Sequence, residues 1–207
     1  AMSNWMKELN EEYPNYNTVG ETWVTEPAYT AWWQMDSKLS APKNSNLKTV
    51  MDFSFFDKIN TAKNEQTETW FKGLDRVYNN FVYDFLYPNP ASVLAFIENH
   101  DTDRFLGEGD NLPMLKQAST LLLTTRRIPQ LYYGTEIMMN GVKSKSDGYV
   151  RKDFPGGWTG DTETALTAAG RSKIQNECYN FYKTLLNWRK GNEVIAKGSM
   201  VQFMVQN

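Results

Sequence analysis

Two carboxyl groups in this sequence could act together on a substrate, because each closes a segment with the character of a β-strand. Glu21 lies beside an aromatic ring in Gly20-Glu21-Thr22-Trp23, and Asp101 ends the string Glu98-Asn99-His100-Asp101. Two carboxyl groups that face one pocket can cleave a glycosidic bond, one by protonating the leaving oxygen and the other by acting near the anomeric carbon. A carboxylate after a strand also often caps the next helix, so both interpretations stay open on these grounds.

The elements that would position these groups alternate along the chain. Strand-like segments lie at residues 17–21, 48–53, 93–97 and 130–133, and the stretches between them have helical patterns. Such alternation predicts repeated βα units around a parallel sheet, which is an α/β fold. In parallel βα barrels the catalytic groups lie at the carboxyl ends of the strands, which is where Glu21 and Asp101 stand.

Two helical patterns carry further expectations. Large apolar side chains recur at spacings of three and four over residues 70–85, which predicts a helix with a buried face formed by Trp70, Phe71, Leu74, Val77, Tyr78, Phe81 and Phe85. A later helix over residues 174–188 would bury the single cysteine, Cys178, as an inert core residue. The chain then turns extended over residues 200–205.

Composition excludes several classes of partner. The net charge is −2 and the two signs are interspersed, so neither nucleic acid nor an anionic membrane surface is an expected partner. The apolar runs are far shorter than the roughly 20 residues of a membrane helix. One cysteine and one histidine leave no intrachain disulfide and no multi-cysteine or multi-histidine metal site, and no cofactor is predicted.

Three strings resemble signature motifs of the α-amylase superfamily, and they occur in the family's order. Residues 20–23 resemble the fifth-strand motif, residues 96–102 the seventh-strand motif and residues 128–136 the eighth-strand motif. Residues 50–53 stand where the sixth strand would be. Residues 153–158, Asp-Phe-Pro-Gly-Gly-Trp, are similar to a string of the neopullulanase and cyclomaltodextrinase branch.

This resemblance implies the C-terminal half of a TIM (β/α)8 barrel, with strands five to eight and their helices over residues 1–196. Residues 197–207 would begin a C-terminal β domain. The implied activity is that of a retaining α-glucan hydrolase that cleaves α-1,4-glucosidic bonds, with α-1,6 cleavage and transglycosylation left open. The implied partner is an α-glucan oligosaccharide or polysaccharide, and calcium is left open for the full-length enzyme without any indication here.

The resemblance also implies roles for individual residues. Glu21 would be the general acid/base, Asp101 would stabilise the oxocarbenium-like transition state, and His100 would hydrogen-bond sugar hydroxyls. Three aromatic residues have flat faces that could stack on a glucose ring, although packing is as good an interpretation for each: Trp23, Tyr133 and Trp158.

Other polar residues near the strand ends are expected to be structural. Arg104 would form a surface ion pair with Asp101 or Asp103 rather than bind sugar. Asp52 and Glu136 would be hydrogen-bonded at strand ends.

The family's fourth-strand signature, Gly-x-Arg-x-Asp, which supplies the nucleophile, occurs nowhere in the sequence. The chain is therefore expected to be inactive alone, although the full-length protein to which it belongs would be an enzyme. No charged and apolar leader is present at the N-terminus. The family resemblance suggests a periplasmic or secreted bacterial enzyme, with a cytoplasmic location as the alternative.

Two rival functions can be weighed from the sequence. A non-catalytic amylase-like barrel that serves as a partner subunit would have lost the catalytic set, whereas Glu21, His100 and Asp101 are all present. A carbohydrate-binding module would show a β-sandwich pattern, which is missing. A sheet whose strands end at Glu21, Asp52, Ile97 and Tyr133 would leave both edges open. A homodimer through these edges is one expectation, and the alternatives are edges covered by the chain itself and an aggregation-prone chain.

Overall fold

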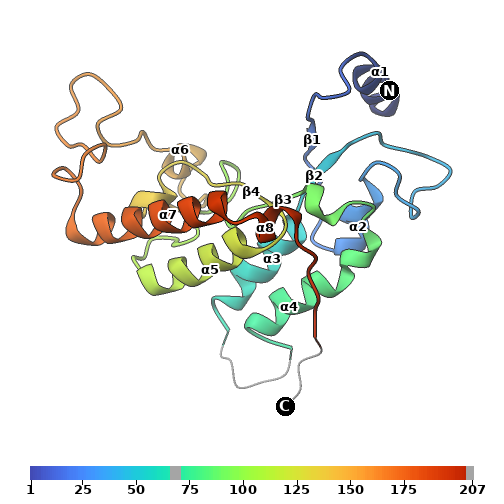
Figure 1. Cartoon of the computed structure of the whole chain (residues 1–207). Coiled ribbons are helices and arrows are strands. Elements are labelled where there is room, and N and C mark those ends of the chain that lie inside the picture. The colour runs from blue at the N-terminus through green and yellow to red at the C-terminus, as the bar shows by residue number, and fades with distance from the viewer. Residues whose placement is uncertain (66–70, 204–207) are drawn as a thin grey trace. The chain divides into compact units, whose positions relative to one another are not determined.

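Four short parallel strands form one sheet in the order β1-β2-β3-β4 (Figure 1). They are β1 (Val19–Gly20), β2 (Thr49–Met51), β3 (Val93–Ala95) and β4 (Ile128–Pro129). The structure, a computed structural model, describes residues 1–65 and 71–203. Helices separate the strands along the chain, so the predicted parallel sheet of βα units is confirmed.

The fourth strand begins and ends earlier than the sequence pattern indicated. Ile128 and Pro129 pair with Leu94 and Ala95, whereas residues 130–133 were expected to form the strand. The Gln130 N–H still donates to the Ala95 carbonyl at 2.8 Å. The chain then leaves the sheet and turns at Gly134, whose φ of +82° is a left-handed conformation that glycine adopts without strain.

Contacts divide the chain into two units, which are described separately. Unit 1 comprises residues 1–96, 126–130 and 196–207, and unit 2 comprises residues 97–125 and 131–195. Besides the sheet, unit 1 contains α1 (Met2–Glu12), α2 (Pro27–Trp32), α3 (Phe53–Ala62), α4 (Leu74–Val82) and the 3-10 helices η1 (Tyr83–Leu86) and η2 (Pro90–Ser92).

The core of unit 1 lies between the sheet and its helices. Strand residues Val50 and Val93 are fully buried together with Phe53 and Phe96. The Phe53 and Phe96 rings meet edge to face at 4.9 Å, a favourable arrangement for aromatic pairs. Asp52 caps α3 by accepting from the Phe55 N–H at 2.9 Å, as its expected structural role requires.

Only part of the apolar face predicted over residues 70–85 is buried. Val77 and Phe81 lie in the core, but Phe71, Leu74 and Phe85 are 65–77% exposed, so their predicted burial is wrong. The helix α4 begins only at Leu74, and at Tyr83 the chain changes to the tighter 3-10 helix η1, which turns Phe85 outward. Trp70, from the same prediction, lies outside the described residues.

Unit 2 is built on two packed helices, α5 (Leu112–Thr124) and α7 (Lys173–Gly191), which lie side by side in Figure 1. Leu115 and Leu122 of α5 and Tyr182 of α7 are buried, and a hydrogen bond between the Ser119 and Tyr182 hydroxyls connects the two helices. Cys178 is a buried free thiol on α7, as predicted. The α7 N-terminus has a capping box formed by Ser172 and Gln175.

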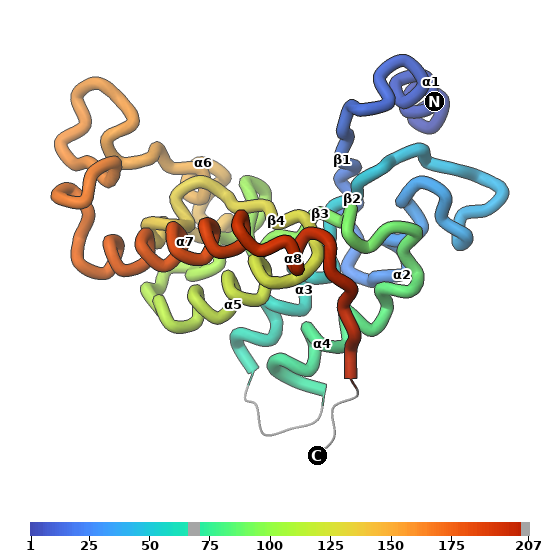
Figure 2. Tube along the Cα trace, in the orientation of Figure 1, coloured from blue at the N-terminus to red at the C-terminus, as the bar shows by residue number. Residues whose placement is uncertain are grey.

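The remaining elements of unit 2 are short: η3 (Thr135–Ile137) and α6 (Asp147–Val150). The stretch from residue 151 to residue 172, orange in Figure 2, contains neither helix nor strand. The helix α8 (Glu193–Lys197) follows α7. Residues 201–203 are not a strand, and residues 204–205 of the predicted extended segment lie outside the described residues, so the C-terminal β domain stays a prediction.

None of the helices described for residues 1–65 and 71–203 combines the length and apolar character needed to cross a membrane.

Candidate active site

The segment that follows β3 carries two of the predicted site residues, His100 and Asp101, on a tight turn in unit 2. Asn99 closes the turn, because its N–H donates to Thr102 Oγ1 at 2.9 Å and its side-chain oxygen accepts from the Asp101 N–H at 2.8 Å. Short polar side chains commonly replace backbone partners in this way. The turn leaves the His100 side chain 56% exposed and that of Asp101 27% exposed.

The Asp101 carboxylate is held from two sides. His100 Nε2 lies 3.2 Å from Asp101 Oδ2, and Arg151 Nη2 donates to Asp101 Oδ1 at 2.6 Å. Arg151 Nε also donates to the His100 carbonyl at 2.8 Å. A carboxylate with both oxygens engaged keeps one orientation, and its partial exposure leaves it within reach of a substrate.

Arg151 was absent from the residues proposed from sequence. It lies 50 positions from Asp101, in the loop after α6, and no local pattern links the two. Asp147 lies 3.4 Å from the same guanidinium group. The only sequence signal available was the length and polarity of this loop, which is typical of functional loops.

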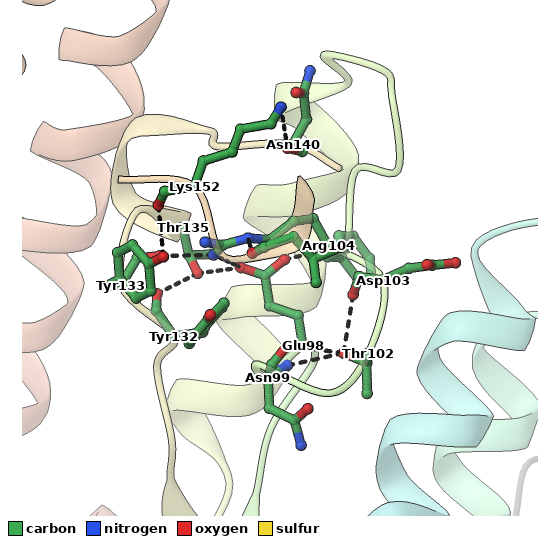
Figure 3. A network of polar contacts seen from close by, with 12 residues as sticks. Glu98, Asn99, Thr102, Asp103, Arg104, Tyr132, Tyr133, Thr135, Asn140 and Lys152 are labelled. Carbon is green, nitrogen blue, oxygen red and sulfur yellow. Dashed lines mark hydrogen bonds and ion pairs between the residues drawn. The ribbon is translucent and has the colours of Figure 1, made fainter. Parts of the chain in front are cut away.

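Arg104 is buried, so its predicted surface ion pair with Asp101 or Asp103 is wrong. Its side chain is 0% exposed and pairs with Glu98 at 3.2 Å, as Figure 3 shows. Asp103 Oδ1 instead accepts from the Lys143 N–H at 2.6 Å. The polar composition of residues 98–104 is typical of an exposed strand end, whereas the chain re-enters the core at Arg104 and Phe105.

Electrostatics around Glu98 reflect this burial. Loss of solvent raises the pKa of the Glu98 carboxyl, and hydrogen bonds from Thr135, the Phe105 N–H and Arg104 oppose that rise. Glu98 is 2% exposed, so its carboxylate interacts with the interior of unit 2 and not with solvent.

Glu21 follows β1 directly, in unit 1, and is exposed. Its neighbours hold it in place: the buried Thr22 donates from Oγ1 to the Met51 carbonyl at 2.8 Å, and Trp23 stacks on Phe53 at 4.6 Å between ring centroids. Trp23 remains 53% exposed. The expected packing contact of Trp23 therefore exists together with an accessible ring surface.

The other two aromatic candidates lie in unit 2. The Tyr133 hydroxyl donates to the Lys152 carbonyl at 2.6 Å, which connects this ring to the residue after Arg151. Trp158 is 67% exposed, and its backbone N–H donates to Asp161 Oδ2 at 3.1 Å. Both rings present surface to solvent.

The predicted residues thus fall into two sets. His100 and Asp101 are brought together in unit 2, which also contains Tyr133, bonded to the carbonyl of the residue after Arg151, and Trp158. Glu21 and Trp23 belong to unit 1. Within the described ranges 1–65 and 71–203, no group of three or more His, Cys, Asp or Glu side chains is placed to hold a metal ion.

The catalytic-domain model of the alpha-amylase family matches residues 1–162. The chain therefore belongs to the alpha-amylase family. It is similar to a cyclomaltodextrin glucanotransferase of Thermoanaerobacterium thermosulfurigenes, with 32% identity over 164 residues, which are 79% of this chain and 20% of the relative. An alpha-amylase of Niallia circulans is 29% identical over 204 residues, which are 99% of this chain and 33% of the relative.

Solved structures agree on the fold. The alpha-amylase of Geobacillus thermoleovorans, complexed with acarbose, matches 95% of this chain and 38% of its own with a TM-score of 0.70 and 21% identity. A cyclomaltodextrinase matches 94% of this chain and 28% of its own with a TM-score of 0.64 and 16% identity. The four βα units are therefore half of a (β/α)8 barrel, strands five to eight, as predicted. The chain spans between 20% and 33% of the length of these two curated relatives.

Proposed function

We propose that this chain supplies the general acid/base and the transition-state carboxylate of a retaining glycoside hydrolase that cleaves α-1,4-glucosidic bonds. The observation that carries the proposal is the Asp101 carboxylate, partly exposed and held by His100 on one oxygen and Arg151 on the other. An oriented anion of this kind is suited to stabilising the positive charge that develops at an anomeric carbon.

The remaining roles follow from the same mechanism. Glu21 would protonate the leaving oxygen and then, as a base, take a proton from the attacking water. His100 would hydrogen-bond sugar hydroxyls. Trp23, Tyr133 and Trp158 would offer ring faces to glucose units.

The nucleophile would come from outside these 207 residues. No Gly-x-Arg-x-Asp string occurs in the sequence, and the curated relatives are several times longer than this chain. A retaining mechanism needs a nucleophilic carboxylate to form its glycosyl-enzyme intermediate. The chain by itself would therefore be inactive.

The names of relatives support an α-glucan substrate. They include cyclomaltodextrin glucanotransferases and an alpha-amylase, and one solved neighbour is complexed with acarbose. The glucanotransferase names favour transglycosylation as a second candidate activity. The string at residues 153–158 supports the neopullulanase and cyclomaltodextrinase branch, in which α-1,6 bonds are further substrates.

The open sheet edges support self-association of the chain. Val19 on β1 and Ile128 on β4 are both exposed, and unpaired strand edges favour pairing with another chain. Light scattering behind size exclusion at micromolar concentration tests this proposal. Elution as a single species of 23.9 kDa would contradict it.

The test of the catalytic proposal is Glu21→Gln in the full-length enzyme, with maltodextrin as substrate. We expect turnover to fall about 10²–10⁴-fold, the usual contribution of general acid–base catalysis. The loss should be smaller with a nitrophenyl maltoside, because its leaving group does not need a proton. Glu26→Gln is the matched control, since Glu26 is an exposed glutamate five positions away whose ion pair with Lys58 is 3.7 Å long. Equal rates for the two variants would remove Glu21 from the mechanism.

A further inference from the structure

A buried ion pair in unit 2 joins three segments of chain around the His100–Asp101 turn. The side chains of Glu98 and Arg104 are 2% and 0% exposed, and Arg104 Nη1 donates to Glu98 Oε1 at 3.2 Å. The pair brackets the turn, since one member precedes it and the other follows it. Burying two charges is costly unless hydrogen bonds replace the lost contacts with water. The hydrogen-bond partners of Glu98 and Arg104 therefore identify the segments that the pair connects.

The Glu98 carboxylate connects the two ends of the turn by hydrogen bonds and also binds the segment after β4. One of its oxygens, Oε2, accepts from the Phe105 N–H at 2.5 Å, which closes the loop from residue 98 to residue 105. The other, Oε1, accepts from Thr135 Oγ1 at 2.5 Å, at the start of η3. Figure 3 shows the Glu98 carboxylate pointing at Arg104 and Thr135, while the Asn99 side chain points away from this pair.

Besides Glu98, the Arg104 guanidinium group contacts the segment after β4 and the end of α6. Nη1 donates to the Tyr133 carbonyl at 2.7 Å, and Nε donates to the Val150 carbonyl at 2.9 Å. The guanidinium carbon lies 4.0 Å from the centre of the Tyr132 ring. The Arg104 N–H donates to the Gly141 carbonyl at 3.0 Å. A planar fork can serve these diverging acceptors together, and a lysine ammonium on a flexible stem cannot.

The Val150 contact leads back to the site. Val150 precedes Arg151, which donates to Asp101 Oδ1 and to the His100 carbonyl. Arg104 therefore holds both the loop that carries Asp101 and the loop that carries the cation bound to Asp101. Arg104 Nη2 is buried and has no hydrogen-bond partner in the described part of the chain, which lowers the stability that the pair contributes. The contacts of the pair are therefore better explained by the loop geometry that they set than by a gain in stability.

We propose that the Glu98–Arg104 pair is the positioning element of this site, which sets the His100–Asp101 turn and Arg151 relative to each other. Neither member of the pair touches the substrate. The chemical importance of this arrangement rests on the proposed function, because it assumes that Asp101 acts on the sugar. The geometric claim can be tested without any activity.

His100 is the only histidine in the sequence, so its imidazole gives one unambiguous NMR signal from the turn itself. The test compares this signal in the unsubstituted 207-residue chain, in Arg104→Lys and in Arg127→Lys, at one fixed alkaline pH. Arg127 is the matched control, because it is also a fully buried arginine, paired with Asp52 at 3.1 Å in unit 1. We expect Arg104→Lys to move or broaden the His100 signal by more than its linewidth. Arg127→Lys should lower the melting temperature and leave the signal in place.

An unmoved His100 signal in folded Arg104→Lys would overturn the proposal, and so would an equal displacement in Arg127→Lys. If Arg104→Lys does not fold, Thr135→Val replaces it, because this variant removes one donor to Glu98 and keeps the side-chain shape. An unmoved His100 signal in Thr135→Val, or an equal displacement in Arg127→Lys, would then overturn the proposal. Addition of maltodextrin distinguishes the positioning role from the proposed α-glucan site. If the His100 signal responds to Arg104→Lys but not to maltodextrin, the positioning role is supported. The same result counts against an α-glucan site in this chain.

Discussion

Replacing Asp52 by asparagine tests how much a buried charge network contributes to unit 1. Asp52 is 0% exposed; its Oδ1 accepts from the Phe55 N–H at 2.9 Å, and its Oδ2 lies 3.1 Å from Arg127 Nε. Arg127 Nη2 also pairs with Asp84 Oδ1 at 2.7 Å. Asp52→Asn keeps an oxygen that can cap α3 but removes the charge opposite a buried arginine.

The expected loss follows from these contacts. Removing one partner of a buried ion pair costs about 3–5 kcal/mol, and the lower value applies here because Arg127 keeps Asp84. Asp52→Ala should cost roughly 1 kcal/mol more, since it also removes the cap. For a chain of this size, a loss of about 3 kcal/mol in the free energy of unfolding lowers the melting temperature by roughly 6–12 °C.

Urea unfolding followed by far-UV circular dichroism measures this loss. Asp57→Asn is the control, because Asp57 belongs to a partly exposed pair with Lys58 at 3.2 Å, which should contribute no more than about 1 kcal/mol. If Asp52→Asn and Asp57→Asn unfold at the same urea concentration, the network is not a stabilising feature and the reasoning fails.

Three further predictions concern activity, pH and thiol chemistry. The purified 207-residue chain should release no reducing sugar from maltodextrin, starch or pullulan, because it contains no Gly-x-Arg-x-Asp nucleophile string; clear turnover would contradict the mechanism. Arg76 lowers the pKa of Glu65 to about 2, so this pair should stabilise the chain above the ordinary value of 4.5 and lose its effect as the pH falls toward 2. Urea midpoints measured across that range should fall less steeply for Arg76→Gln than for the unsubstituted chain. Burial raises the pKa of the Cys178 thiol to about 12, so iodoacetamide should label it only after unfolding, and rapid labelling of the native chain would show that α7 opens.

Local patterns were enough to predict a parallel sheet of βα units. Alternating strand-like and helical segments report which residues prefer which backbone, and a βα alternation has few ways to fold. The burial of Cys178 followed in the same way, from apolar periodicity within α7. The strings at residues 20–23, 96–102 and 128–136 indicated the family because each is contiguous, so no tertiary contact is needed to recognise it.

The sequence could not predict where a helix stops short or which charged residue turns inward. Phe71 and Phe85 fit the period of a helix, but the chain around α4 changes conformation at both ends and leaves them exposed. Such changes depend on competition between local turns and packing against other elements.

Tertiary structure alone decided the environment of the two arginines near Asp101. Arg104 is buried because Glu98, Tyr133 and Val150 converge on it from three segments, and Arg151 meets Asp101 across 50 residues of chain. The energy of a charged side chain depends on all groups around it, and those groups come from distant parts of the sequence. The motif therefore predicted which carboxylate could act, and only the folded chain determined what holds that side chain in place.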